Sequence, residues 1–274
     1  MRAMNNTLRK TLVLVLGLAC LCAASPLWAS EAVTVTLPPL AGLVRILLPD
    51  ARVQCLLPAH ADPHRFTLSP RQIEQWHHAR LVVRSMADDA GWSFLDQQRK
   101  ASTLSLWEHE PHGWLDPQRL EPALDTLAAG LSKAFPEKAA EIRSRLPGSK
   151  AMVQRIIREW QQGLTRLKPH GVILQHASWL PLMKASGVKV HLLLEAGPHG
   201  AGHTPHLLEQ AVGLLRKDPS IWLIGDIRHD SRTLEWLANQ VHPPARWLSL
   251  DPIGTCGEPW DALMHNNLRH LLEH

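Results

Sequence analysis

Residues 150–174, KAMVQRIIREWQQGLTRLKPHGVIL, separate two halves of the chain that share one alternating pattern of strands and helices. Lys150–Leu167 is amphipathic, with apolar residues at helical spacing along one face. The apolar run Val172–Leu174 then restarts the strand–helix alternation. Because Pro147-Gly148 breaks helices, we expect this connecting helix to start only at about Ser149.

The alternation on both sides of this segment predicts an α/β fold. The expected strands are Ala32–Leu37, Arg52–Leu57, Leu81–Val83, Val172–Leu174, Val188–Leu194, Ile221–Ile224 and Arg246–Leu250. Helical patterns separate them, so each half should form a lobe with a mostly parallel sheet flanked by helices. The predicted parts are an N-terminal lobe (30–148), a connecting backbone helix (149–168) and a C-terminal lobe (169–274). A ligand is expected in the cleft between the lobes, beyond the carboxyl ends of the strands.

The first 29 residues have the pattern of a secretory signal peptide. Arg2, Arg9 and Lys10 precede the uncharged apolar run Thr11–Ala24, and cleavage is expected after Ala29. The run is too short to span a bilayer core of ~30 Å. A lipid anchor on Cys20 is the alternative, but Gly17 fits a lipobox poorly. The sequence therefore predicts an exported protein that is released in soluble form by cleavage.

The remaining composition points to metal and away from nucleic acid. Residues 1–29 hold three of the 29 Lys and Arg and none of the 25 Asp and Glu, so without them the formal charge falls from +4 to +1. No basic stripe remains for nucleic acid. The chain has 17 His and no Tyr, and histidine is the commonest metal ligand.

Four segments each hold a candidate metal ligand. They are HADPHRF with His64, HEPHGWLDP with His112, VILQHASW with His176 and SLDPIGT with Asp251. Each candidate follows a predicted strand or lies in a loop that enters a helix. Three imidazoles and a carboxylate suit a tetrahedral Zn(II) site better than Mn(II), which prefers more oxygen ligands.

The same segments carry a family resemblance. Asp62-Pro63-His64 with the following Leu68-Ser69-Pro70, His112–Pro117, His176 after a strand, and Leu250–Thr255 occur in this order along nearly the whole chain after residue 29. This order resembles the zinc/manganese solute-binding proteins of bacterial ABC importers, and most closely the periplasmic zinc-uptake proteins. The resemblance implies a two-lobed fold, four metal ligands at the positions above, and delivery of the metal to a membrane permease.

Further residues are candidates for accessory roles. His60, Asp62 and Asp116 lie beside the ligand motifs and could orient the imidazoles. The Gly- and Pro-rich loop 197–206 contains His199, His203 and His206. This loop is either solvated and without metal or a second, weaker metal-acquiring site.

Other functions remain as alternatives at this point. They are a periplasmic zinc metallochaperone, a binder of Mn(II) or another divalent metal, and a binder of a bulky metal chelate. A zinc hydrolase is least favoured, because the sequence has no HExxH motif and no Glu in the ligand motifs is an obvious general base. We therefore expect a transport component and not an enzyme. We also expect this component to be a monomer.

Two cysteines, Cys55 and Cys256, lie beyond residue 29. An oxidising compartment permits a disulfide between them. Cys55 lies inside an apolar strand-like run, which favours two separate buried thiols.

Overall fold

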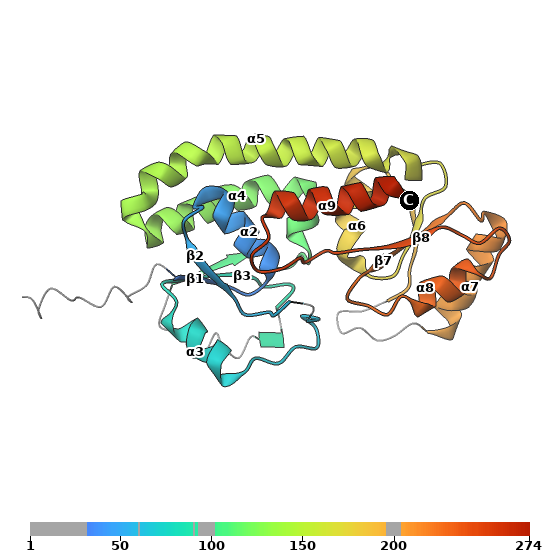
Figure 1. The fold of residues 1–274 in the computed structure, drawn as a ribbon, viewed down its shortest axis with the longest axis horizontal. Coiled ribbons are helices and arrows are strands. Elements are labelled where there is room, and N and C mark those ends of the chain that lie inside the picture. The colour runs from blue at the N-terminus through green and yellow to red at the C-terminus, as the bar shows by residue number, and fades with distance from the viewer. Residues whose placement is uncertain (1–31, 60, 90, 93–101, 196–203) are drawn as a thin grey trace, which may run out of the picture. The chain divides into compact units, whose positions relative to one another are not determined.

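The fold consists of two parallel sheets with flanking helices, which confirms the predicted α/β class (Figure 1). The computed structural model describes residues 32–59, 61–89, 91–92, 102–195 and 204–274. The predicted signal peptide lies outside these residues. Among the described helices, none combines the length and apolar character needed to cross a membrane.

The first sheet has the strand order β2-β1-β3-β4, with all neighbours parallel. Its strands are β1 (Ala32–Val35), β2 (Arg52–Cys55), β3 (Leu81–Ser85) and β4 (Ser102–Leu106). The helices of this half are α2 (Pro38–Leu47), α3 (Pro70–His78), α4 (Pro117–Ala134) and the 3₁₀ turns η2 (Gly113–Leu115) and η3 (Pro136–Lys138). Ser69 caps α3, since its hydroxyl accepts a hydrogen bond from the backbone N–H of Gln72. Strand β4 was missing from the sequence prediction.

The second sheet repeats this arrangement, with the order β6-β5-β7-β8 and parallel neighbours throughout. Its strands are β5 (Val172–Leu174), β6 (Val190–Leu193), β7 (Trp222–Asp226) and β8 (Trp247–Leu250). Its helices are α6 (Leu180–Ala185), α7 (Pro205–Lys217), α8 (Arg232–Ala238) and the 3₁₀ turns η4 (Leu164–Leu167) and η5 (Ala177–Trp179). In both sheets the chain order reverses beside the first strand, where open α/β sheets bind ligands.

Helix α5 joins the halves and runs without interruption over Ala139–Gly163. The expected start near Ser149 is therefore wrong, because Pro147 lies inside the helix. Side chains on both sides of the proline are buried, among them Ile142 before it and Val153 and Trp160 after it. Packing of α5 against α4 and α9 (Trp260–Glu273) holds both parts of the helix in line, although an interior proline costs about 3 kcal/mol (Figure 1).

The last helix, α9, packs on the first half of the chain, against α2 and α5. The Nε1–H of Trp160 donates to the carbonyl of Met264 (3.2 Å), and the Nε1–H of Trp260 donates to that of Trp114 (3.1 Å). Gly42 permits this approach, since a Cβ there would lie 2.6 Å from the backbone N of Trp260. Residues 32–274 accordingly form one compact unit. The boundaries at 148 and 168 stay a prediction, and α9 contacts both parts.

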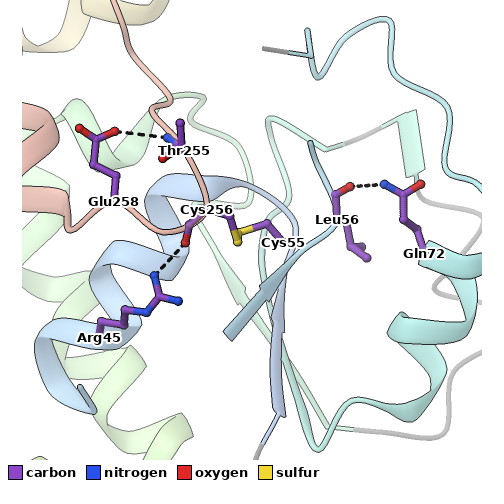
Figure 2. Close-up of a disulfide and its surroundings, with 7 residues drawn as sticks. All are labelled: Arg45, Cys55, Leu56, Gln72, Thr255, Cys256 and Glu258. Carbon is purple, nitrogen blue, oxygen red and sulfur yellow. Dashed lines mark hydrogen bonds between the residues drawn. A yellow bond between two sulfur atoms is a disulfide. The ribbon is translucent and has the colours of Figure 1, made fainter. Parts of the chain in front are cut away.

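Cys55 and Cys256 form a disulfide, with their Cα atoms 5.8 Å apart (Figure 2). The expectation of two separate thiols is wrong. Cys55 ends β2, and Cys256 lies between β8 and α9, 201 residues further along the chain. Only the return of the chain from the second sheet to the first brings these residues together, and no local pattern in the sequence predicts that return.

Candidate metal centre

Three of the predicted ligands converge. Ring nitrogens of His64, His112 and His176 all lie within 4.8 Å of one another. The ring centroids of His64 and His112 are 5.6 Å and 5.4 Å from that of His176. His64 and His112 lie in loops beyond β2 and β4 of the first sheet. His176 lies two residues after β5 of the second sheet, directly before η5. The parallel strands thus bring three distant loops to one place.

The backbone around His112 is held in an unusual conformation. His112 has φ 59°, in the left-handed region, and its N–H donates to the Asp88 carboxylate at 2.9 Å. Asp88 follows β3, is buried, and also accepts a hydrogen bond from the Ser85 hydroxyl. Burial raises the pKa of Asp88 to about 7, against the lowering effect of these hydrogen bonds. The carboxylate therefore fixes where His112 enters the site.

The electrostatics of His112 favour metal binding. Burial, with the nearby His176 and His64, lowers the pKa of His112 well below its ordinary value. An imidazole must be neutral to ligate a metal, so the site keeps His112 in the binding form. The Trp114 ring packs edge-on against His112, with centroids 5.6 Å apart, and shields it on one side.

Glu195 orients His176. Its Oε2 lies 3.1 Å from Nδ1 of His176, and its Oε1 lies 2.9 Å from Nδ1 of His229. Burial would raise the pKa of Glu195, but the hydrogen bonds from both histidines lower it to about 2. An ionised carboxylate only accepts hydrogen bonds, so both Nδ1 atoms carry protons. Nε2 of His176 is then left for a metal, as in carboxylate–histidine–metal arrangements.

His229 belongs to the same network. Its ring stacks on His176, with centroids 4.8 Å apart and planes inclined by 28°. Burial would lower the pKa of His229, but Glu195 and Asp226 raise it above its ordinary value. His176, Glu195 and His229 also form a group whose ligand atoms lie within 4.8 Å of one another. His229 is therefore a neighbour of the imidazole cluster, with its Nδ1–H held by Glu195.

The structure does not bring Asp251 into the three-histidine group. Its Oδ1 accepts hydrogen bonds from Nη2 of the buried Arg228 (3.1 Å) and from the backbone N–H groups of Ile253 (3.0 Å) and Gly254 (2.9 Å). The carboxylate thus serves a turn and an ion pair. Three of the four candidate ligands come together, and the fourth is held by an arginine.

The accessory candidates have structural roles where they are described. Asp62 accepts a hydrogen bond from the backbone N–H of His64 (2.9 Å). Asp116 caps α4 through the N–H of Gln118 (2.9 Å). His206 lies exposed in the first turn of α7, with its Nε2 2.9 Å from the Gln210 amide. His60, His199 and His203 lie outside the described residues.

Sequence reasoning missed Asp88 and Glu195. Glu195 directly follows the predicted strand Val188–Leu194, and Asp88 lies five residues after the predicted strand Leu81–Val83. In a parallel sheet such positions face the same edge as the ligand loops, so an acidic residue there was a usable signal.

Comparison with known proteins places the chain in a family. The sequence model described as "Zinc-uptake complex component A periplasmic" matches residues 33–274. A putative metal-binding protein of Thermotoga maritima is 26% identical over 255 residues, covering 89% of this chain and 92% of that protein.

Solved structures show the same fold. A crystal structure of ZnuA matches with a TM-score of 0.75 at 20% identity, covering 88% of this chain and 97% of that one. A Mn-bound periplasmic metal-binding protein from Candidatus Liberibacter asiaticus matches with a TM-score of 0.76 at 12% identity (89% and 99% covered). The Zn(II)-bound ZnuA-like domain of Streptococcus pneumoniae AdcA matches with a TM-score of 0.69 at 20% identity (88% and 97% covered). Since the family match spans nearly the whole chain, this protein belongs to the periplasmic zinc-uptake component A family, whose members are metal-binding solute-binding components of importers and not enzymes.

Proposed function

We propose that this protein captures Zn(II) with His64, His112 and His176 and delivers it to the membrane permease of an ABC importer. The observation that carries the proposal is the convergence of three imidazoles from three separate loops within 4.8 Å. Neutral imidazole nitrogens are good zinc ligands, and three of them leave one tetrahedral position for water or another ligand.

Zinc is favoured over manganese by the chemistry of the donor set. Manganese prefers sites with more oxygen ligands. Here the one predicted oxygen ligand, Asp251, accepts hydrogen bonds at Oδ1 from Arg228 and two backbone N–H groups. Related folds occur bound to Mn as well as Zn, so the fold alone does not select the metal. We therefore assign metal selectivity to the side chains, because three imidazoles converge while the predicted carboxylate ligand forms an ion pair with Arg228.

The carboxylates behind the ligands support the same proposal. Glu195 holds His176 in the tautomer that offers Nε2, and Asp88 holds the backbone of His112. Metal sites commonly use such outer partners to orient their ligands. The buried Asp88 and Glu195 thus have a role that a purely structural histidine cluster would not need.

The cellular setting is part of the proposal. Residues 1–29 would direct export to the periplasm, and the mature protein would act as a monomer that meets the permease. A zinc metallochaperone would use the same site, and only the identity of the acceptor distinguishes it. A bulky metal chelate is a poor match, because three imidazoles this close leave room for a single ion between them.

Calorimetry tests this proposal. Metal-free protein comprising residues 30–274 is titrated with zinc, with manganese as competitor. We expect tight binding of a single zinc ion per chain that manganese does not displace, and loss of that binding in His112→Ala. The matched control is His78→Ala, which removes an exposed histidine from the end of α3. Unchanged zinc binding in His112→Ala would exclude the three-histidine site.

A further inference from the structure

One segment contacts residues beside His112 and His176 and is cross-linked to Cys55, which ends the strand before the loop of His64. Residues 251–259, here called the strap, lead from β8 of the second sheet to α9, which packs on the first half. Within the strap, Gly254 has φ 67° and so turns the chain in a conformation that side chains rarely adopt. The strap therefore follows a defined path between the two halves of the protein.

On the side of the second sheet, Arg228 holds the strap. Its Nη2 donates to Asp251 Oδ1 (3.1 Å) and to the Gly254 carbonyl (2.7 Å). The next residue, His229, shares the Glu195 carboxylate with His176. The beginning of the strap is thus connected to the surroundings of His176 through the adjacent residues Arg228 and His229.

On the side of the first sheet, the strap is held at two points. The Nε1–H of Trp114 donates to the carbonyl of Pro252 (2.7 Å), and the Trp114 ring packs on His112. Further along, Cys256 is bonded to Cys55, and Arg45 Nη1 donates to the carbonyl of Cys256 (2.8 Å), as Figure 2 shows. Cys55 ends β2, and the loop after β2 carries His64.

We propose that the Cys55–Cys256 disulfide positions the metal ligands, by fixing the strap that links the surroundings of His64 and His112 to those of His176. The cross-link joins the end of β2 to the chain leaving β8, so it limits movement of the first-sheet ligand loops relative to the second. Ligands held in place before binding lose less conformational entropy when the ion arrives, which raises affinity. This inference rests on the proposed zinc function.

The test compares the oxidised protein with the double variant Cys55→Ser/Cys256→Ser. Zinc dissociation constants are measured by competition with a chromophoric chelator, at a temperature where far-UV circular dichroism shows both proteins folded. We expect the double variant to bind zinc about tenfold more weakly and to release it faster. Equal affinity within about twofold in folded protein would overturn the inference.

A control separates positioning from general destabilisation. Leu271→Ala removes a buried side chain from α9, away from the strap, and should lower the melting temperature without weakening zinc binding. If the double variant does not fold, Arg45→Met serves in its place, because it keeps the disulfide and removes the hydrogen bond to the Cys256 carbonyl. Unchanged zinc affinity in Arg45→Met would then refute the positioning role of the strap.

The outcomes distinguish this inference from the function on which it rests. If the unmodified protein binds no zinc, the zinc function and the positioning role of the disulfide are both refuted. If the unmodified protein binds zinc tightly and the folded variants bind it equally well, only the positioning role of the disulfide is refuted.

Discussion

The Glu195 carboxylate provides the sharpest test of how the site is organised. Each of its oxygens accepts a hydrogen bond from the Nδ1–H of a different histidine, His176 at 3.1 Å and His229 at 2.9 Å. In Glu195→Gln, the amide has a single oxygen, so it accepts from only one of the two rings. The other ring faces an N–H donor and must move its proton to Nε2, the atom that His176 needs for the metal.

The magnitude follows from the loss of this contact. A hydrogen bond to a charged group contributes about 1.5–3 kcal/mol. Outer-shell partners of metal ligands change affinity by about 10- to 100-fold, or about 1.4–2.8 kcal/mol, which agrees with that range. We therefore expect Glu195→Gln to weaken zinc binding by about 10- to 100-fold while the ring of His176 stays in place.

The assay is a zinc competition titration with a chromophoric chelator, together with a thermal melt of the metal-free protein. The matched control is Glu159→Gln, because Glu159 also accepts from a histidine, His265 Nε2 at 2.9 Å, on helices away from the site. A zinc dissociation constant of Glu195→Gln that equals that of Glu159→Gln would refute the role assigned to Glu195.

Three further predictions follow from the same structure. Arg228→Met removes the cation that holds Asp251, and we expect manganese affinity to rise relative to zinc by about tenfold, measured by competition titration; an unchanged ratio would contradict the assignment of selectivity. The lowered pKa of His112 keeps its imidazole neutral in the folded protein, while in the unfolded chain this imidazole takes up a proton below its ordinary pKa of 6.5, so metal-free protein should lose stability as the pH falls below 6.5. Thermal melts from about pH 7.5 to about 5 should show that the stability of His112→Gln depends less on pH than that of the unmodified protein. Parallel profiles of the two proteins would contradict the lowered pKa of His112. Pro147→Ala should stabilise α5 by up to about 3 kcal/mol in denaturant unfolding, and no gain would mean that the helix has adapted fully to its proline.

The sequence predicted the repeated strand–helix order because apolar periodicity is strong in both halves. Strand β4, with sequence STLSL, escaped detection because it lies at a sheet edge, is half exposed and mixes small polar residues with leucine. The break expected at Pro147-Gly148 did not occur, because packing on both sides of the proline outweighs its local preference. Local sequence patterns thus identified most helices and strands, and they failed where tertiary contacts determine whether a segment forms a helix or a strand.

The residues of the histidine cluster could be predicted from the sequence, but their hydrogen-bonding partners could not. His64, His112 and His176 were visible because each lies in a recognisable motif at a strand end. The motif around Asp251 gave no sign that Arg228 would hold its carboxylate, and the disulfide depends on residues 201 positions apart. Ion pairs and cross-links between distant loops require the fold, since no periodicity in the chain encodes them.

The return of α9 to the first half of the chain affects when the protein can fold. Buried Trp260, Met264 and Leu271 cover apolar faces of α2 and α5, and these faces stay open until residues 260–273 are available. A chain that is truncated before Trp260, or that is still being synthesised on the ribosome, therefore exposes the apolar faces of α2 and α5 and has no stable N-terminal half. Folding must wait for the final segment, so truncation at that end should lead to aggregation and degradation and not to a smaller working domain.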